Sequence, residues 1–346
     1  MSGPVTKVLR LVFLVGFFVL AILFNAHKPR VLILHSYNPD YAWSRDEDAG
    51  IQTLAKYWNH YSVTRHFMDT NRYPDKDWLR RAGIAARRAI DRIDPDVLIA
   101  VDDPAQELAA KHYVDHPRMR IVFAGINASV ESYGYLEADN VTGIYEHKPI
   151  EAVKELVQAL EAGKSDPKVT PRVLYLIDPS LSMSRDRYLI DAFDWNPLDY
   201  AGSRRVEDFA AWKSVVADLA DEGIDYLLVG NYRNLRQSPT DPAIPSPATV
   251  MGWTEQNSPV PVIGVNVFNV EDGGAIAVGP SAAEQGIKAA EMTEAILDRG
   301  IPPEDLPFLP NRQYIVAMSR SALARRGLKL PQVYENFARS TSTYRE

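Results

Sequence analysis

The chain has 346 residues, of which 46% are hydrophobic and 24% charged, which is enough to form one large or two medium globular domains. A formal net charge of -7 argues against a nucleic-acid partner, because such proteins present a basic surface. The absence of cysteine excludes disulfides, thiolate metal sites, a cysteine nucleophile and lipid attachment through cysteine.

The N-terminal segment indicates export. Lys7 and Arg10 precede an unbroken apolar run from Leu11 to Phe24, the layout of a secretory signal. The run is short for a membrane span, which needs about 20 residues. No small-x-small cleavage site follows it. Residues 1–27 are therefore predicted to be a signal peptide or, through residues 8–24, a retained anchor, with the rest of the chain periplasmic or extracytoplasmic.

Short apolar runs then alternate with helical patterns in two series. The predicted strands are 30–36, 61–68, 96–101 and 119–124 in the first series, and 172–177, 226–230 and 260–265 in the second. Their lack of alternation is typical of strands buried on both faces of a parallel sheet. Helices are predicted between them, including 209–222 and 282–299. Capping boxes, Ser44 with Glu47 and Asp103 with Gln106, are predicted to begin two of the helices.

Two such series predict an α/β protein with two Rossmann-like lobes around a cleft. The predicted divide lies near residues 147–151, after an extended connector. In open parallel sheets, ligands bind beyond the carboxyl ends of the strands. This rule and the nearby aromatic residues select the following candidates for ligand contact: Ser36, Tyr37, Trp43, Asp102, Asp103, Asn127, Asp178, Ser180, Asn231, Tyr232 and Asn266.

Each candidate also has a structural interpretation. Asp103 is well placed as a helix N-cap, whereas Asp102 is free to face a cationic or hydroxylated ligand. The asparagines suit turns. Tyr37 and Trp43, with the nearby Tyr41, could stack on a flat ligand or cover the lobe surface. Arg233 could bind a ligand carboxylate or lie on the surface.

Signals for catalysis or metal binding are weak. The chain has no G-x-S-x-G elbow, no P-loop and no G-x-G-x-x-G after the first strand. His112 and His116 have metal-ligand spacing, but Pro117 predicts the end of their helix. We therefore expect no enzyme activity, cofactor or metal, and instead a recognition site for a small polar molecule, amine-bearing or aromatic.

Several segments in order give a family resemblance. They are LILHSYNP at 32–39, MDTNR at 68–72, DDPA at 102–105, VFAGIN at 122–127, NVTG at 140–143, and EQG and AAEM near residue 290. From Arg30 to Pro331 the chain resembles the ABC transporter substrate-binding protein family, which has the type I periplasmic binding protein fold. The HSY and DD segments are similar to the branch also found as extracytoplasmic sensor domains of histidine kinases.

The resemblance implies three crossings between the lobes. Lobe 1 would comprise residues 28–146 and 280–312, lobe 2 residues 147–279 and 313–331, and a tail residues 332–346. It further implies a protein that delivers its ligand to an ABC permease or, as the alternative, a membrane-tethered sensor signalling by lobe closure to a separate receptor or kinase. A monomer is the default expectation. Family members that bind amino acids usually hold the carboxylate at a Thr- or Ser-containing turn. Asp102 and Asp103 occupy that turn here, and their charge would repel an anion.

Overall fold

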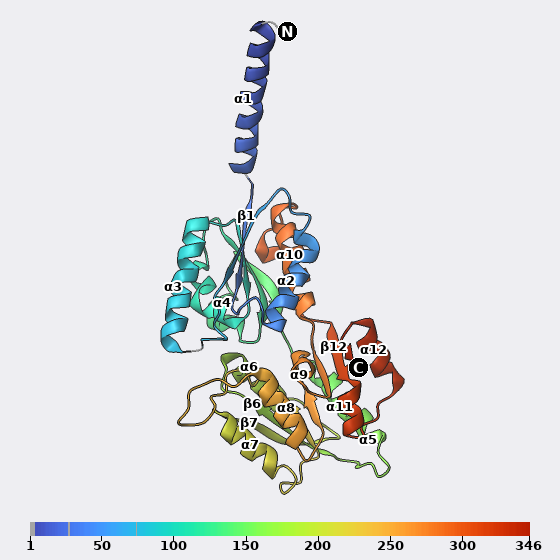
Figure 1. Ribbon diagram of the computed structural model, residues 1–346. Coiled ribbons are helices and arrows are strands. Elements are labelled where there is room, and N and C mark those ends of the chain that lie inside the picture. The colour runs from blue at the N-terminus through green and yellow to red at the C-terminus, as the bar shows by residue number, and fades with distance from the viewer. Residues whose placement is uncertain (1–3, 27, 74) are drawn as a thin grey trace.

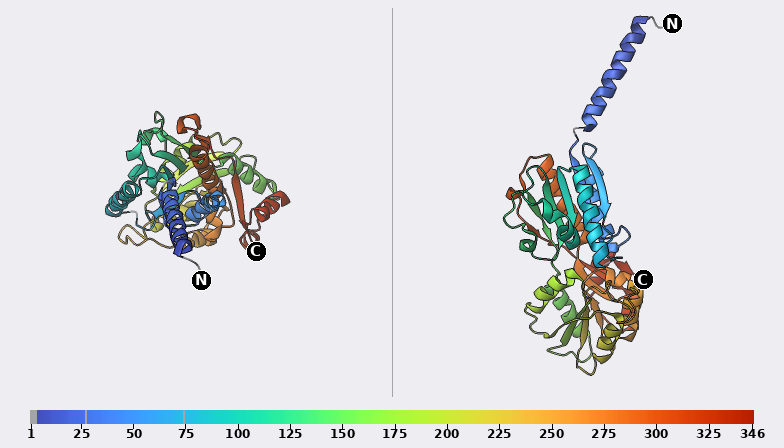
Figure 2. Two further views of the ribbon diagram at one scale, coloured as in Figure 1. Left: turned by 90° about the horizontal axis from the view of Figure 1, so that it is seen from above. Right: turned by 90° about the vertical axis from the view of Figure 1, so that its left-hand side faces the viewer.

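The computed structural model describes the backbone of residues 4–26, 28–73 and 75–346 (Figure 1). Side chains are described within these ranges except at positions 4–8, 21–24, 26, 181, 182, 184 and 185. Two α/β lobes are stacked end to end, and a separate N-terminal helix extends from lobe 1 (Figures 1 and 2). The predicted fold class, two lobes built on mainly parallel sheets, is confirmed.

Lobe 1 is built on a six-stranded parallel sheet of order β11-β5-β4-β3-β1-β2. Its strands are β1 (Arg30–His35), β2 (Ser62–Phe67), β3 (Val97–Val101), β4 (Arg120–Ile126), β5 (Val141–Tyr145) and β11 (Leu309–Pro310). One face packs on α2 (Ala42–Ala55) and α10 (Ala282–Leu297), and the other on α3 (Lys76–Ile93) and α4 (Asp103–Leu108). Strand β3, VLIAV, is fully buried because apolar helices cover both faces.

Lobe 2 has a seven-stranded sheet of order β13-β12-β10-β9-β8-β6-β7, in which the β10–β12 pair is antiparallel. The strands are β6 (Arg172–Ile177), β7 (Asp199–Arg205), β8 (Tyr226–Val229), β9 (Val262–Gly264), β10 (Ile276–Pro280), β12 (Tyr314–Ser319) and β13 (Tyr344–Arg345). One face packs on α5 (Ile150–Ala162), α6 (Leu181–Asp191), α11 (Arg320–Arg325) and α12 (Gln332–Ser340). The other packs on α7 (Phe209–Asp218), α8 (Pro247–Asn257) and α9 (Phe268–Glu271).

The chain passes between the two sheets three times. It leaves lobe 1 after β5, returns after β10 to form α10, and leaves again between β11 and β12. Three short 3-10 helices complete the described elements: η1 (Ala110–Tyr113), η2 (Val130–Tyr133) and η3 (Pro303–Asp305). The lobes are therefore joined by three connecting segments, an arrangement that permits hinge closure.

The N-terminal helix α1 (Pro4–Ala26) stands clear of both lobes (Figure 2). Its large apolar side chains between positions 9 and 20 are exposed; Phe13, for example, is 72% exposed. Among the described residues, no helix is long and apolar enough to cross a membrane.

Both predicted capping boxes are wrong. Helix α2 begins at Ala42 with Tyr41 as N-cap, so Ser44 and Glu47 lie inside the helix, where both are buried. Asp103 is the first residue of α4, and its carboxylate binds groups outside that helix. Spacing alone suggested the caps, whereas the N-cap residues of the two helices are Tyr41 and Asp102, and neither makes a side-chain capping hydrogen bond.

Candidate ligand-binding cleft

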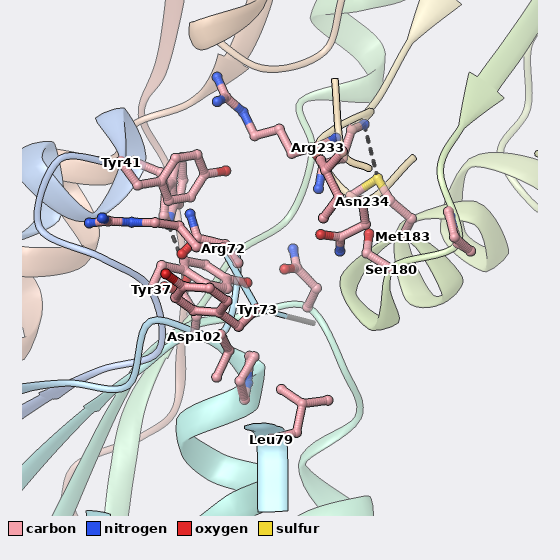
Figure 3. A pocket seen from close by; sticks show the side chains of 18 of the residues that line it. Tyr37, Tyr41, Arg72, Tyr73, Leu79, Asp102, Ser180, Met183, Arg233 and Asn234 are labelled. Carbon is pink, nitrogen blue, oxygen red and sulfur yellow. Dashed lines mark hydrogen bonds between the residues drawn. The ribbon is translucent and has the colours of Figure 1, made fainter. Parts of the chain in front are cut away.

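A cleft of about 700 Å³ lies between the lobes. Figure 3 shows Tyr37, Tyr73 and Asp102 from lobe 1 on one side, and Ser180, Met183, Arg233 and Asn234 from lobe 2 on the other. The volume falls within the usual range for small-molecule sites, roughly 300–1,000 Å³. Its lining combines aromatic rings with hydrogen-bonding groups.

Strand register explains why distant residues meet in this cleft. In lobe 1, His35 of β1 pairs with Val101 of β3, which in turn pairs with Ala124 of β4. The carboxyl ends of the three strands are therefore level, and the loops that follow them lie side by side. The same relation holds in lobe 2, where Leu176 of β6 pairs with Val229 of β8.

Seven of the predicted ligand-contact residues line the cleft: Tyr37, Trp43, Asp102, Asn127, Ser180, Asn231 and Asn266. Asn231 also has the turn role considered for it, because its side-chain oxygen accepts hydrogen bonds from the backbone of Tyr232 and Arg233. The other four, Ser36, Asp103, Asp178 and Tyr232, lie outside the lining.

Two of these four, Ser36 and Asp103, stabilise the loops that follow the lobe 1 strands. The Ser36 hydroxyl donates to the carbonyl of Val101 at 2.6 Å and accepts from the backbone N–H of Ala105 at 2.7 Å. Asp103 accepts hydrogen bonds from two backbone N–H groups and the Tyr133 hydroxyl. Burial raises the pKa of Asp103 to about 6. These contacts fix the loop that carries Asp102.

The other two have the same kind of role in lobe 2. Asp178 accepts from the backbone and hydroxyl of Ser180 and from the backbone of Asn234. Tyr232 is fully buried, and its hydroxyl donates to Asp272 at 2.6 Å. Strand-end position predicts proximity to the cleft, but which side chain points inward depends on the turn that follows.

Asp102 is the most unusual polar group of the lining. It is 3% exposed, and its backbone has a φ of 65°, a region that non-glycine residues rarely adopt. One carboxylate oxygen, Oδ1, accepts a 2.9 Å hydrogen bond from Nε1 of Trp43. Burial, followed by the charges of Glu146 and Asp103, raises the pKa of Asp102 well above its ordinary value.

A second buried carboxyl lies beside it. Glu47 is fully buried, and burial followed by the nearby charge of Asp102 raises its pKa well above the ordinary value. Gly125 makes room for the pair: a Cβ added there would lie 2.7 Å from both Asp102 Oδ1 and Glu47 Oε1. Sequence analysis missed Glu47 because its spacing from Ser44 fits a capping box.

A buried ion-pair network joins the lobes near the first crossing. Nζ of Lys148 contacts the carboxylate of Glu146, lies 3.5 Å from Oδ2 of Asp186 and donates to Oδ1 of Asn266 at 2.8 Å. Asn127 of lobe 1 also donates to Asp186 at 3.3 Å. Although burial opposes it, the charges of Asp186 and Glu146 raise the pKa of Lys148. No sequence pattern marks Lys148 or Asp186, because Lys148 lies in a connector and Asp186 inside helix α6.

Arg233 is not a surface residue. Its side chain is 15% exposed, and its guanidinium is paired with Asp272. The guanidinium also lies 4.5 Å from the ring centroid of Phe268 and 5.0 Å from that of Tyr41 across the cleft. It therefore joins the two lobes through cation–π contacts.

Comparisons with known proteins agree with this architecture. Residues 238–340 match the family model described as ABC transporter substrate binding protein. No curated relative matches the sequence. A conserved domain protein from Vibrio cholerae has a TM-score of 0.66 and 16% identity, covering 92% of this chain and 100% of its own.

Two further solved structures are similar. An ABC domain in complex with L-Trp from Streptococcus pneumoniae has a TM-score of 0.65 and 16% identity, covering 90% of this chain and 98% of its own. A ligand-free, open substrate binding protein with adhesive properties from Clostridium difficile has a TM-score of 0.63 and 17% identity, covering 88% and 96%. The resemblance predicted from the sequence, and the type I periplasmic binding protein fold, are confirmed.

Proposed function

From this fold and this family match, we propose that the protein is an extracytoplasmic solute-binding protein. It captures a small polar organic molecule between its lobes and delivers it, as a monomer, to an ABC permease. The observation that carries the proposal is the cleft of about 700 Å³, to which both lobes contribute aromatic and hydrogen-bonding side chains.

Ligand binding would act by stabilising the closed arrangement of the lobes. Tyr37 and Trp43 offer rings from lobe 1, while Ser180 and Asn231 offer polar groups from lobe 2. A molecule that contacts both sets binds the closed state better than the open state, so it shifts the population toward closure. The permease would recognise the closed lobes.

A second candidate function is a membrane-tethered sensor that presents the same closure to a separate receptor or kinase. The exposed apolar side chains of α1 are compatible with either function, because an apolar helix that packs on neither lobe suits an export signal or a tether. The mass of the protein recovered from cells separates the two functions. Loss of residues 1–27 favours delivery to a permease, and retention favours the sensor.

The experiment that tests capture is thermal unfolding of the full-length protein against a panel of amino acids, amines, sugars, nucleosides and aromatic acids. A ligand at 100 times its dissociation constant adds about 2.7 kcal/mol of stability, which raises the melting temperature by a few degrees. The variant Tyr37→Ala should lose the shift, because its ring lines the cleft.

The matched control is Tyr57→Ala, which removes a ring that is 68% exposed on lobe 1. This variant should keep the full ligand-induced shift. If no member of the panel raises the melting temperature of the wild-type protein, including after unfolding and refolding to remove co-purified ligand, small-molecule capture is wrong.

A further inference from the structure

We propose that the lobe 1 side of the cleft is a cation subsite, and that the ligand carries an organic ammonium or similar cation received by the carboxylate of Asp102. This inference rests on the proposed function, since it assigns a charge to the molecule that the lobes capture. It follows from the burial of Asp102, the way the other charges of the cleft are paired, and the rings around it.

Asp102 lines the cleft and has an oxygen without a partner. Its Oδ1 accepts from Trp43, whereas its buried Oδ2 has no hydrogen-bond partner within the part of the chain that the structure describes. A buried carboxylate oxygen that is not hydrogen-bonded is costly, and such groups in proteins usually have a bound partner. Tyr37 lies near this carboxylate, because burial and then the charge of Asp102 raise the pKa of Tyr37.

Glu47 adds negative charge next to Asp102. Glu47 is in hydrogen-bonding contact with Trp43 and Asp102, and the absence of a side chain at Gly125 lets the two carboxyls approach each other. Two carboxyls so close lose their protons one after the other, because two adjacent negative charges repel. A cation bound beside the pair would favour its ionised form.

The neighbouring cations of the lining are already paired with other carboxylates. Lys148 is held by Glu146 and Asp186, and Arg233 by Asp272. Arg72 is held by Asp69 and Asp40. Arg236, the remaining cation of the lining, is exposed on lobe 2. The positive charge that balances Asp102 and Glu47 is then expected to come from the ligand.

The surroundings of Asp102 favour an organic cation over a metal ion. Tyr37 and Trp43 also line this part of the cleft, and aromatic rings attract ammonium groups through cation–π interactions. Across the described ranges, no group of three or more His, Asp and Glu side chains is arranged to hold a metal ion. An anionic ligand group placed here would face the carboxyl pair directly.

Three probes that share a phenol ring test the charge. They are tyramine, a cation; tyrosine, a zwitterion; and 3-(4-hydroxyphenyl)propionate, an anion; putrescine is added as an aliphatic cation. Calorimetric titration of the full-length protein should show that tyramine or putrescine binds at least about tenfold more tightly than the anion. Asp102→Asn should weaken binding of the cation by at least about tenfold.

Asp221→Asn is the matched control. It makes the same substitution at an exposed carboxylate of lobe 2 that does not line the cleft, so binding of the cation should be kept. Its melting temperature and that of Asp102→Asn, measured without ligand, show that both variants are folded. If either fails to fold, the comparison of the four probes on the wild-type protein still decides.

The possible outcomes separate this inference from the proposed function. If the anion binds as tightly as the cations, or if folded Asp102→Asn binds the cation unchanged, the cation subsite is wrong. If neither cation binds while a sugar, nucleoside or acid raises the melting temperature, the inference fails and the proposed function stands. If nothing in either panel binds, both fail.

Discussion

Lys148 and Asp186 form an ion pair between the first interlobe connection and helix α6, with 3.5 Å between Nζ and Oδ2. Their side chains are 4% and 1% exposed. A charge pair this deeply buried gains strength from the low local dielectric, but each charge depends on its partner because water is excluded. The pair therefore links helix α6 of lobe 2 to the first connection between the lobes.

Replacing Lys148 by Met should destabilise the protein strongly. The substitution leaves the carboxylates of Glu146 and Asp186 buried without their cation, and removing one partner of a buried ion pair costs about 3–5 kcal/mol. Denaturation with urea above pH 7, where Asp186 is ionised, should show a lower midpoint. The control is Lys288→Met, because Lys288 pairs with Glu291 at the surface of α10 and such pairs contribute about 0–1 kcal/mol. Equal midpoints for the two variants would contradict a structural role for the buried pair.

The pH dependence of stability should report the protonation of Asp186. Burial raises the pKa of Asp186 from 3.8 to about 7 in the folded protein. A carboxyl with a raised pKa holds its proton more tightly when folded, so its contribution to stability is greatest below pH 3.8 and is lost as the pH rises through about 7. The stability of the wild type relative to Asp186→Asn should therefore fall between about pH 4 and about pH 7.

Asp94 provides the control with the opposite shift. A hydrogen bond from Arg118, together with the charges of Arg118 and Arg30, lowers the pKa of Asp94. Its contribution to stability is thus present above its ordinary pKa and is lost only in acid. The stability difference between the wild type and Asp94→Asn should stay flat over the range in which the Asp186 difference falls. A flat difference for Asp186 as well would show that its carboxyl is ionised throughout that range.

Gly125 should tolerate substitution less well than a glycine of similar backbone geometry. Gly125 and Gly134 have φ values of 68° and 75°, so a side chain at either position is strained by roughly 1–2 kcal/mol. A Cβ at Gly134 meets nothing within 4 Å, whereas one at Gly125 would lie 2.7 Å from the carboxylates of Asp102 and Glu47. Gly125→Ala should cost about 1–3 kcal/mol more than Gly134→Ala.

Thermal or urea unfolding of the two alanine variants measures this difference, with no ligand needed. Because both variants carry the same backbone strain, the excess cost reports contact with the carboxyl pair. Equal losses of stability would mean that Asp102 and Glu47 can move aside, and that the pair is not held rigidly below the cleft.

The fold could be predicted from the sequence because its strands are short apolar runs separated by helices, a local pattern. Position at strand ends also placed Tyr37, Asp102 and Asn231 at the cleft. The rest of the site depends on long-range packing. Asp186 becomes relevant only because helix α6 lies against Asn127 of the other lobe. Glu47 has the spacing of a cap, and its burial beside Asp102 depends on where α2 packs.

Helix starts explain why the two predicted capping boxes were wrong. The N-cap of α4 is Asp102, one position before the predicted cap, so Asp103 is the first residue of the helix. Its carboxylate binds the loop of Asn127 instead of capping the helix. Arg233 was open to two interpretations because a loop arginine is usually exposed. Its burial depends on Asp272, which lies far along the chain, and on the ring of Tyr41 from the other lobe.

The contact between Tyr41 and Arg233 should hold the ligand-free lobes together. Tyr41 of lobe 1 lies 5.0 Å from the Arg233 guanidinium and 6.0 Å from the ring of Phe268, both in lobe 2. Cation–π contacts of partly buried groups are worth about 1–2 kcal/mol, enough to change the population of two lobe arrangements by roughly tenfold. Tyr41→Ala should therefore shift the ligand-free protein toward an open state.

Small-angle X-ray scattering measures the change as a larger radius of gyration. The control is Tyr57→Ala, since Tyr57 is exposed on lobe 1 and its removal leaves the contacts between the lobes intact. Because the two variants lose the same side chain, any difference in radius arises from where that side chain lies. Equal radii for Tyr41→Ala, Tyr57→Ala and the wild type would mean that the lobes are held by the Lys148 network and the three connections, without help from the aromatic contact.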